Sequence, residues 1–299
     1  MNTTEYLSKW AISYKDDIIN NIMPFWMKYG LDKEHGGVYT CVNRDGSLMD
    51  TTKSVWFQGR FGFIAAYAYN NIEKNPQWLA ASKSCIDFIE AHCFDTDGHM
   101  FFEVTEDGVP LRKRRYVFSE GFAAIAMAEY SLATGEKEYA EKALEIFKRT
   151  QHFLDTPGML EPKYLPAMSS RGHSITMILI NTASRIRMVI DDPVLTEQID
   201  ASIAALRKYF IHPEFKALLE MVGPNGEFID TCNGRVINPG HCIETAWFIM
   251  EEAKYRNWDK DLLQLALQIL DWSWEWGWDK EFGGIINFRD CRNLPAQDY

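Results

Sequence analysis

The sequence predicts an all-α protein of the α/α toroid class, in which an inner layer of helices alternates with an outer layer. The first observation is a repeat of roughly 62 residues, because VWFQG at 55–59 and VFSEG at 117–121 each begin a run with helical spacing. The second is an alternation of two kinds of helix, one rich in small and aromatic residues and one charged and amphipathic. The third is a glycine-centred turn between successive helix pairs. Together, the three observations favour a protein built of stacked repeats.

Each repeat is expected to contain a helix, a long loop with a short β-hairpin, and a second helix. The segments DKEHGGV at Asp32 and DKEFGGI at Asp279 share the pattern D-K-E-aromatic-G-G-aliphatic, and glycine between short apolar stretches is typical of a hairpin. We expect hairpins at 31–39, 94–102, 223–230 and 278–286. Inner helices are expected to begin near residues 55, 117, 174 and 239, and outer helices to cover 5–28, 77–92, 137–152, 194–210 and 260–276.

The length of the repeat separates a toroid from an open solenoid. An open HEAT-like solenoid is the alternative, but its repeats have roughly 40–47 residues. The pattern yields nine helices, five outer and four inner, whereas a ring closed by six pairs needs twelve helices and about 370 residues at this period. We therefore expect a single α/α-barrel domain over 1–299 that stops about three helices short of a closed ring.

Composition excludes several functional classes. The formal net charge of −11 argues against a nucleic-acid partner, which would require clustered Lys and Arg. No apolar run approaches the roughly 20 residues that span a bilayer, so no membrane association is expected. The six cysteines are scattered without a CxxC pair, which is typical of reduced thiols in the cytoplasm rather than of disulfides or a zinc site. Phosphate loops, GxSxG and HExxH are also missing from the sequence.

The stretch NPGHCIETAWF at 238–248 has the features of a capped helix start with a histidine in its first turn. Asn238 is a favoured N-cap and Pro239 suits the first helical position. Glu244 follows His241 by three residues on the same face. The positive end of the helix dipole disfavours an imidazolium, so His241 could act as a base with Glu244 fixing its tautomer. A buried histidine that caps a neighbouring carbonyl is an equally weighted alternative.

Arg60 is a second candidate, because a charged residue in an otherwise apolar inner helix needs an anion, a polar ligand or a carboxylate. The same reasoning applies to Glu120, at the repeat position of Gln58. Pairing of Arg60 with Glu120 across neighbouring inner helices is an alternative that is compatible with a functional role. His173 is interpreted chiefly as a surface residue in a cap region, with a functional role as the less favoured alternative.

Four motifs together carry a resemblance to a known family. VWFQGR at 55–60, FSEGFAAIAMAEYSLATGE at 118–136, NPGHCIETAWF at 238–248 and GWDKEFGGI at 277–285 resemble the N-acylglucosamine 2-epimerase family. The resemblance implies an (α/α)6 barrel and an isomerase that interconverts N-acetylglucosamine and N-acetylmannosamine. It implies proton removal and return at C2 of the opened sugar, through an enediolate-like intermediate, by two histidines.

The resemblance also implies individual roles. His241 is one catalytic histidine, Glu244 is its carboxylate partner, and Arg60 holds substrate oxygens and stabilises negative charge. The cavity-lining residues that it suggests are Trp56, Tyr116, Glu120, Met177 and Trp247. The family's second histidine lies on the last inner helix, which we expect to lie beyond this sequence. No metal or cofactor is expected, ATP is a candidate allosteric modulator, and a homodimer is left open.

Two alternatives to the epimerase remain open. The first is a truncated, inactive relative that binds a sugar or a partner protein. The second is a glycoside hydrolase on the same toroid, which would require two opposed carboxyl groups. Glu120 and Glu244 are the pair that this hypothesis would use.

Overall fold

The structure is a computed structural model of the 299-residue chain and describes residues 2–113, 116–160 and 169–296. The chain divides into two compact units. Unit 1 consists of Met1–Glu161 and Met188–Ile190, and unit 2 of Pro162–Arg187 and Asp191–Tyr299. The expectation of one domain over 1–299 stays a prediction.

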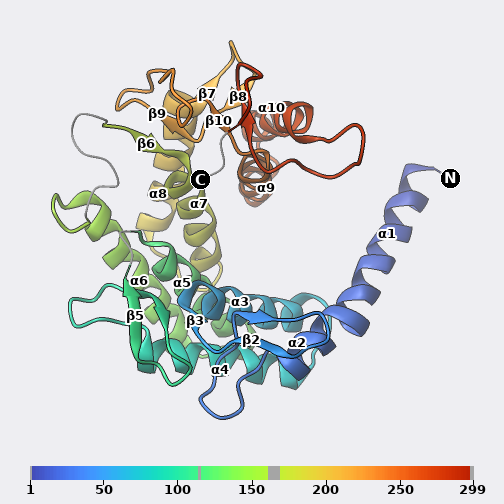
Figure 1. The fold of residues 1–299 in the computed structure, drawn as a ribbon, viewed down its shortest axis with the longest axis vertical. Coiled ribbons are helices and arrows are strands. Elements are labelled where there is room, and N and C mark those ends of the chain that lie inside the picture. The colour runs from blue at the N-terminus through green and yellow to red at the C-terminus, as the bar shows by residue number, and fades with distance from the viewer. Residues whose placement is uncertain (1, 114–115, 161–168, 297–299) are drawn as a thin grey trace. The chain divides into compact units, whose positions relative to one another are not determined.

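Unit 1 contains two inner helices, α3 and α5, and their outer partners (Figure 1). Inner α3 packs against both α4 and α5, and α5 packs against α6. Residues 119–131 of α5 are all buried, as expected of an inner helix, whereas α6 buries one face. The elements of this unit are α1 (Thr3–Asp17), the π-helical segment η1 (Ile18–Ile22), α2 (Met23–Tyr29), β1 (Cys41–Val42), β2 (Leu48–Asp50), β3 (Lys53–Ser54), α3 (Val55–Asn71), α4 (Pro76–His92), β4 (Phe101–Val104), β5 (Pro110–Lys113), α5 (Phe118–Thr134) and α6 (Lys137–Asp155).

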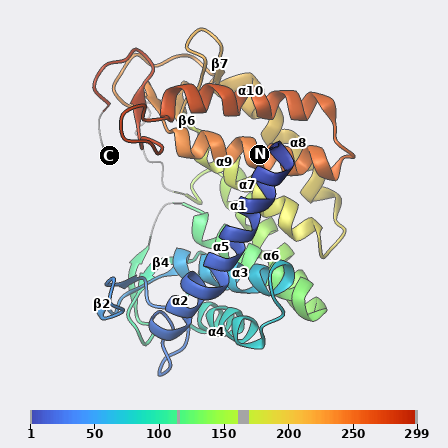
Figure 2. The ribbon, with the colours of Figure 1, turned by 90° about the vertical axis from the view of Figure 1, so that its right-hand side faces the viewer.

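Unit 2 repeats the same helical alternation with more irregular loops. Figure 2 shows α9 and α10 side by side, and α7 packs against both α8 and α9. Its short strands pair antiparallel as β6 with β9, β7 with β8 and β10 with β11. The elements are β6 (Arg171–Gly172), α7 (His173–Arg187), α8 (Pro193–Ala205), the π-helical segment η3 (Leu206–Phe210), β7 (Ile211–His212), β8 (Ala217–Leu218), β9 (Met221–Val222), β10 (Val236–Ile237), α9 (Pro239–Tyr255), α10 (Lys260–Gly277) and β11 (Arg289–Asp290).

The predicted helices are confirmed, and three of the four predicted hairpins are smaller than expected. The hairpin predicted at 223–230 is wrong, because the strand before it, β9, pairs with β6 and no strand lies within 223–230. Each predicted inner and outer helix is present in the described ranges, and the first outer helix is interrupted by η1. Three of the glycine turns close with a single β-bridge, at 31–38, 94–100 and 278–285. The two D-K-E turns are equivalent in detail, because Asp32 Oδ1 accepts from the amides of residues 34 and 35 and Asp279 Oδ1 from those of 281 and 282.

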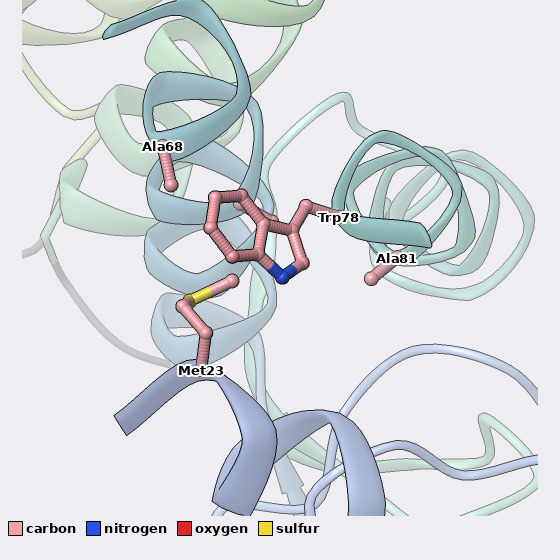
Figure 3. Packing of buried hydrophobic residues seen from close by; sticks show 5 residues of the cluster. Met23, Ala68, Trp78 and Ala81 are labelled. Atoms are coloured by element: carbon pink, nitrogen blue, oxygen red, sulfur yellow. The ribbon is translucent and has the colours of Figure 1, made fainter. Parts of the chain in front are cut away.

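Small residues allow the helices of unit 1 to approach closely. A Cβ added to Gly59 on α3 would lie 2.6 Å from the carbonyl carbon of Phe122 on α5, so only glycine fits there. Outside this contact, Met23, Ala65, Ala68, Trp78 and Ala81 form a buried core between α2, α3 and α4 (Figure 3). Trp78 fills its centre with only 4% of its surface exposed. Burial of apolar area of this kind supplies the main stabilisation of each helix pair.

A buried ammonium group joins the loops of the first two repeats. Lys53 is fully buried, and its Nζ lies 2.7 Å from Asp32 Oδ2. The same Nζ donates to the carbonyl oxygens of Gly36 and Glu106, at 2.8 and 2.7 Å. The ring centroid of Phe88 lies 4.2 Å from it, within the range of a cation–π contact. The buried charge is therefore both paired and hydrogen-bonded, as burial requires.

All six cysteines are unpaired thiols, with Cys41 and Cys232 exposed and the other four buried. Among the helices in the described ranges, none combines the length and the apolarity needed to cross a membrane.

Candidate functional site

The start of α9 has the predicted capped geometry. Asn238 is the N-cap with extended backbone, and its side chain accepts a hydrogen bond from the amide of His241 at 3.1 Å. Pro239 occupies the first helical position, as expected. This cap fixes the His241 side chain on the first turn, where 39% of it is exposed. The histidine is thus held by the backbone and accessible from solvent.

Glu220 provides the carboxylate that contacts His241. Its Oε1 lies 2.9 Å from His241 Nδ1. Glu220 lies between β8 and β9, where its carbonyl oxygen accepts from the His173 amide and its own amide donates to the carbonyl of Val236. Because Val236 belongs to β10, which leads directly into α9, these backbone bonds set the carboxylate between the starts of α7 and α9. The sequence predicted Glu244 for this contact, and its catalytic role stays a prediction.

His173 is buried, so its interpretation as a surface residue is wrong. As the first residue of α7 it has no exposed surface. Its Nδ1 lies 3.2 Å from Glu220 Oε1, and its Nε2 lies 2.9 Å from Thr245 Oγ1. Pairing of Gly172 in β6 with Met221 in β9 places Glu220 next to the start of α7. The two histidines therefore share one carboxylate oxygen.

The shared carboxylate of Glu220 is negatively charged. Burial alone would raise its pKa, yet the hydrogen bonds from His173 and His241 lower the pKa to about 2. A carboxylate that accepts hydrogen bonds from two donors retains its charge even when buried. Glu220 can therefore fix the tautomer of His241 and stabilise an imidazolium there.

The three side chains are also of a kind that could bind a metal ion. The ligand atoms of His173, Glu220 and His241 lie within 4.8 Å of one another. However, one oxygen faces both Nδ1 atoms at hydrogen-bonding distance, and protons on these nitrogens account for the contacts. We therefore describe the cluster as hydrogen-bonded and assign no metal to it.

The other candidates of unit 2 differ in exposure. Glu244 is half-buried, one turn beyond His241 on α9. Trp247, two turns from His241, is 47% exposed, and its ring centroid lies 5.1 Å from that of Phe248. Met177 on α7 is buried at 5% exposure. Their proposed contacts with a substrate stay predictions.

In unit 1, the structure brings Trp56, Arg60 and Tyr116 together around phenylalanine rings. Trp56 lies 5.2 Å from Phe118 between ring centroids, and Tyr116 lies 6.1 Å from the same ring. The exposed guanidinium of Arg60 lies 4.4 Å from the ring centroid of Phe122. An aromatic surface next to a cation is suited to the apolar face and the oxygens of a sugar.

Glu120 lies inside this unit rather than at its surface. It is 1% exposed, and its Oε1 accepts from the amide of Met100 at 2.9 Å. Its Oε2 is buried without a hydrogen-bond partner in the described residues, and burial raises the pKa of this carboxyl to about 7. The pairing with Arg60 that the sequence left open is not formed within the described ranges. Gln58, at the equivalent repeat position, bonds to both the amide and the carbonyl of Val38.

Sequence reasoning missed Glu220 and Thr245. Glu220 lies in the apolar run ALLEMV just before a glycine turn. A charged residue in such a run needs buried partners, and this was the available signal. Thr245 carried no such signal in the sequence, because a threonine inside a helix is common.

Comparisons of sequence identify related proteins over most of the chain. A family model described as N-acylglucosamine 2-epimerase (GlcNAc 2-epimerase) matches residues 37–299. The N-acylglucosamine 2-epimerase of Homo sapiens is 30% identical over 289 residues, which cover 93% of this chain and 67% of the human protein. That of Mus musculus is 29% identical over 307 residues, covering 98% of this chain and 72% of the mouse protein.

A comparison of structures supports the predicted fold class. The cellobiose 2-epimerase from Bacillus thermoamylovorans B4167 superposes with a TM-score of 0.84 at 20% sequence identity. The match covers 95% of this chain and 76% of that chain. At this identity the likeness shows the fold alone, and it confirms the predicted class, an all-α (α/α)6 toroid with short strands in its loops.

Proposed function

Because the chain belongs to the N-acylglucosamine 2-epimerase family, we propose that it is an isomerase that interconverts N-acetylglucosamine and N-acetylmannosamine. The observation that carries the proposal is the accessible His241 at the start of α9, with Nδ1 held by the ionised carboxylate of Glu220. A neutral imidazole held in this way is a suitable general base near neutral pH. The chemistry needs no cofactor, because both half-reactions are proton transfers next to a carbonyl.

The proposed reaction begins with the opened sugar, whose C1 carbonyl acidifies the hydrogen at C2. An ionised carboxylate only accepts hydrogen bonds, so His241 carries its proton on Nδ1 and proton transfer to the sugar falls to Nε2. The C2–H bond breaks, the proton moves to Nε2, and its electron pair forms a C1–C2 double bond with an enolate oxygen at C1. The charge of Glu220 stabilises the imidazolium that results. Delivery of a proton to the opposite face of C2 completes the epimerisation.

We propose, from the family resemblance, a substrate-binding role for three residues of unit 1. Arg60, whose guanidinium is exposed and permanently charged, would hold substrate oxygens and stabilise negative charge. Trp56 and Tyr116 would pack on the apolar face of the sugar. Trp247 and Met177 complete the proposed set of substrate contacts, and Glu244 keeps its proposed catalytic role. Glu120, suggested by the resemblance as a further contact, is 1% exposed and is left out of the set.

Three finer points belong to the same proposal. We propose a cytoplasmic location, consistent with six thiols that form no disulfide. ATP modulation and a homodimer are proposed from family resemblance. ATP modulation is tested by the activity with and without ATP, and the homodimer by the mass of the particle in solution.

The experiment that tests the proposal follows hydrogen exchange at C2 in D2O. Removal of the C2 proton in D2O replaces it by deuterium, which NMR detects as loss of the H2 signal, whether or not the configuration inverts. The wild-type chain is expected to exchange H2 of both N-acetyl sugars and to produce the other epimer. His241→Asn should lower exchange by about 10²-fold or more, the usual contribution of a general base. His35→Asn, at an exposed loop position, is the matched control and should exchange normally.

Unchanged exchange in His241→Asn would contradict the role of His241. A wild-type chain that exchanges neither sugar would contradict the proposed reaction itself. Release of new reducing ends from an oligosaccharide would instead support a hydrolase.

A further inference from the structure

His173 is a buried residue that the proposed reaction does not yet use. It is the first residue of α7, it has no exposed surface, and it contacts Glu220 at two points. Its backbone amide donates to the carbonyl oxygen of Glu220 at 3.0 Å. Its ring Nδ1 lies 3.2 Å from Oε1 of the same residue. This pair of contacts fixes both the backbone of Glu220 and the direction of its carboxylate.

Glu220 needs such a support because it is a flexible side chain on an irregular segment. It lies between β8 and β9, which have two residues each. Ordering a glutamate side chain costs up to about 2 kcal/mol in entropy, and a single hydrogen bond contributes a similar amount. The bond to His241 alone would therefore hold the carboxylate only weakly. A side chain at the start of a helix is a more rigid support than a loop.

The ionised state of Glu220 determines which atoms donate to its Oε1. Burial acts to raise the pKa of this carboxyl, but the hydrogen bonds from His173 and His241 lower it to about 2. A carboxylate that is ionised near neutral pH can only accept hydrogen bonds. The Nδ1 atoms of His173 and His241 therefore both donate to Oε1, at 3.2 and 2.9 Å.

The other ring nitrogen of His173 connects to the helix that carries His241. Nε2 lies 2.9 Å from Oγ1 of Thr245, a fully buried residue of α9. The same Oγ1 lies 2.9 Å from the carbonyl oxygen of His241, one turn earlier. This connection is made for either direction of the hydroxyl hydrogen. His173 thus links the carboxylate that contacts His241 to the first turn of the helix that holds it.

We propose that His173 is a positioning residue, which holds the Glu220 carboxylate and the first turn of α9 in the geometry that presents His241 to the sugar. The inference rests on the proposed function for its consequence in catalysis. Because His173 has no exposed surface, it does not touch the substrate. Its loss should therefore slow the proton transfer and leave the affinity for the sugar unchanged.

The first test compares two substitutions of His173 in the C2 exchange assay. His173→Leu keeps a buried apolar side chain but removes both ring nitrogens. His173→Asn keeps a donor near the place of Nδ1 and is the matched control. In the Leu variant we expect kcat for exchange to fall about 10- to 100-fold, the cost of a displacement of up to about 1 Å, with KM unchanged. The Asn variant should retain most of the wild-type kcat.

The comparison separates positioning from simple packing. A Leu variant with the wild-type kcat would overturn the proposal. Equal losses in the Leu and Asn variants would also overturn it, because they would show that the shape of the ring matters and its hydrogen bond to Glu220 does not. Both variants are assayed well below their thermal melting transitions, so that unfolded protein does not contribute to the loss.

The second test reads the hydrogen bonds of Glu220 without using activity. Wild-type protein labelled with 15N in its histidine rings should show hydrogen on Nδ1 of both His173 and His241 near neutral pH. A bare Nδ1 on His173 would overturn the proposal. In His173→Leu, the Nδ1 hydrogen of His241 should lose its protection from exchange with water, because the carboxylate that accepts it is no longer held. Unchanged protection would overturn the positioning role.

Failure of the proposed function can be distinguished from failure of this inference. If the wild-type chain exchanges H2 of neither N-acetyl sugar, the proposed function fails, while the NMR measurement still decides whether His173 donates to Glu220. If the Leu variant does not fold, the NMR measurement on wild-type protein makes the same decision.

Discussion

Glu120 is expected to be a carboxyl group that destabilises the folded protein at alkaline pH. In the first repeat, Gln58 accepts from the Val38 amide at 2.9 Å and donates to its carbonyl at 2.6 Å. In the second repeat, Glu120 accepts from the equivalent amide of Met100, but its other oxygen has no partner within the described part of the chain. An amide can satisfy both backbone groups, whereas a carboxylate can only accept. Glu120→Gln should therefore fit this position better.

The magnitude follows from the pKa of Glu120. Burial raises it from the ordinary 4.5 to about 7, a difference that corresponds to about 3 kcal/mol. Because the folded state binds the proton more tightly, this stability is fully present below the unfolded value and is lost as pH rises through about 7. Glu120→Gln has no proton to lose. It should match the wild type near pH 4 and exceed it near pH 8 by up to about 3 kcal/mol.

Urea denaturation of both proteins at these two pH values measures the difference. Gln58→Glu is the matched reverse variant, since it places a carboxyl group in the equivalent buried position of the first repeat. It should lose stability as pH rises, in the opposite sense to Glu120→Gln. The reasoning is refuted if Glu120→Gln is less stable than the wild type near pH 8, or if the gap does not change with pH.

Three further predictions concern other buried groups. Lys53→Met should cost about 3–5 kcal/mol in urea denaturation, because it leaves the buried Asp32 carboxylate without its cation. A loss below about 1 kcal/mol would contradict this, and adding Asp32→Asn should recover part of the loss. Glu220→Gln keeps the shape of the side chain but removes its charge next to His241, so C2 exchange should fall about 10²-fold or more. An unchanged exchange rate would contradict the role of the Glu220 charge. Dialysis against a chelator should leave exchange unchanged, because hydrogen bonds account for the contacts of Glu220; a loss that added zinc reverses would contradict this.

The helices could be predicted from the sequence because each carries its own signals. The N-cap at Asn238 and the repeated D-K-E turns depend on neighbouring residues, and the structure reproduces both. Three of the hairpins were predicted too large. Each of these turns is closed by a single β-bridge, and the sequence around a single bridge has no alternating pattern that would distinguish it from a longer two-stranded ladder. The π-helical segment at Ile18–Ile22 had no signal, since its sequence is compatible with an ordinary helix.

The hydrogen-bonding partners in the site depend on the path of the chain, and this limited their prediction. His241 could be placed because its position is set by a local cap. Its contact with Glu220 spans 21 residues and an irregular loop, so the i, i+3 spacing suggested Glu244 instead. His173 follows the polar stretch SSRG, which suggested exposure. Its contact with Glu220, 47 residues away, depends on the pairing of β6 with β9, which no local pattern indicates.

The buried ammonium of Lys53 has a consequence for the way the chain opens. Its partners come from the Asp32–Gly36 turn of the first repeat and from Glu106 in the β4–β5 loop of the second. If either loop detaches, the charge loses part of its hydrogen bonding while it is still shielded from water, which is costly. The two loops should therefore detach together. In hydrogen exchange, the amides of Val38 and Met100 should show one common opening free energy, so that two repeats unfold as a single cooperative unit.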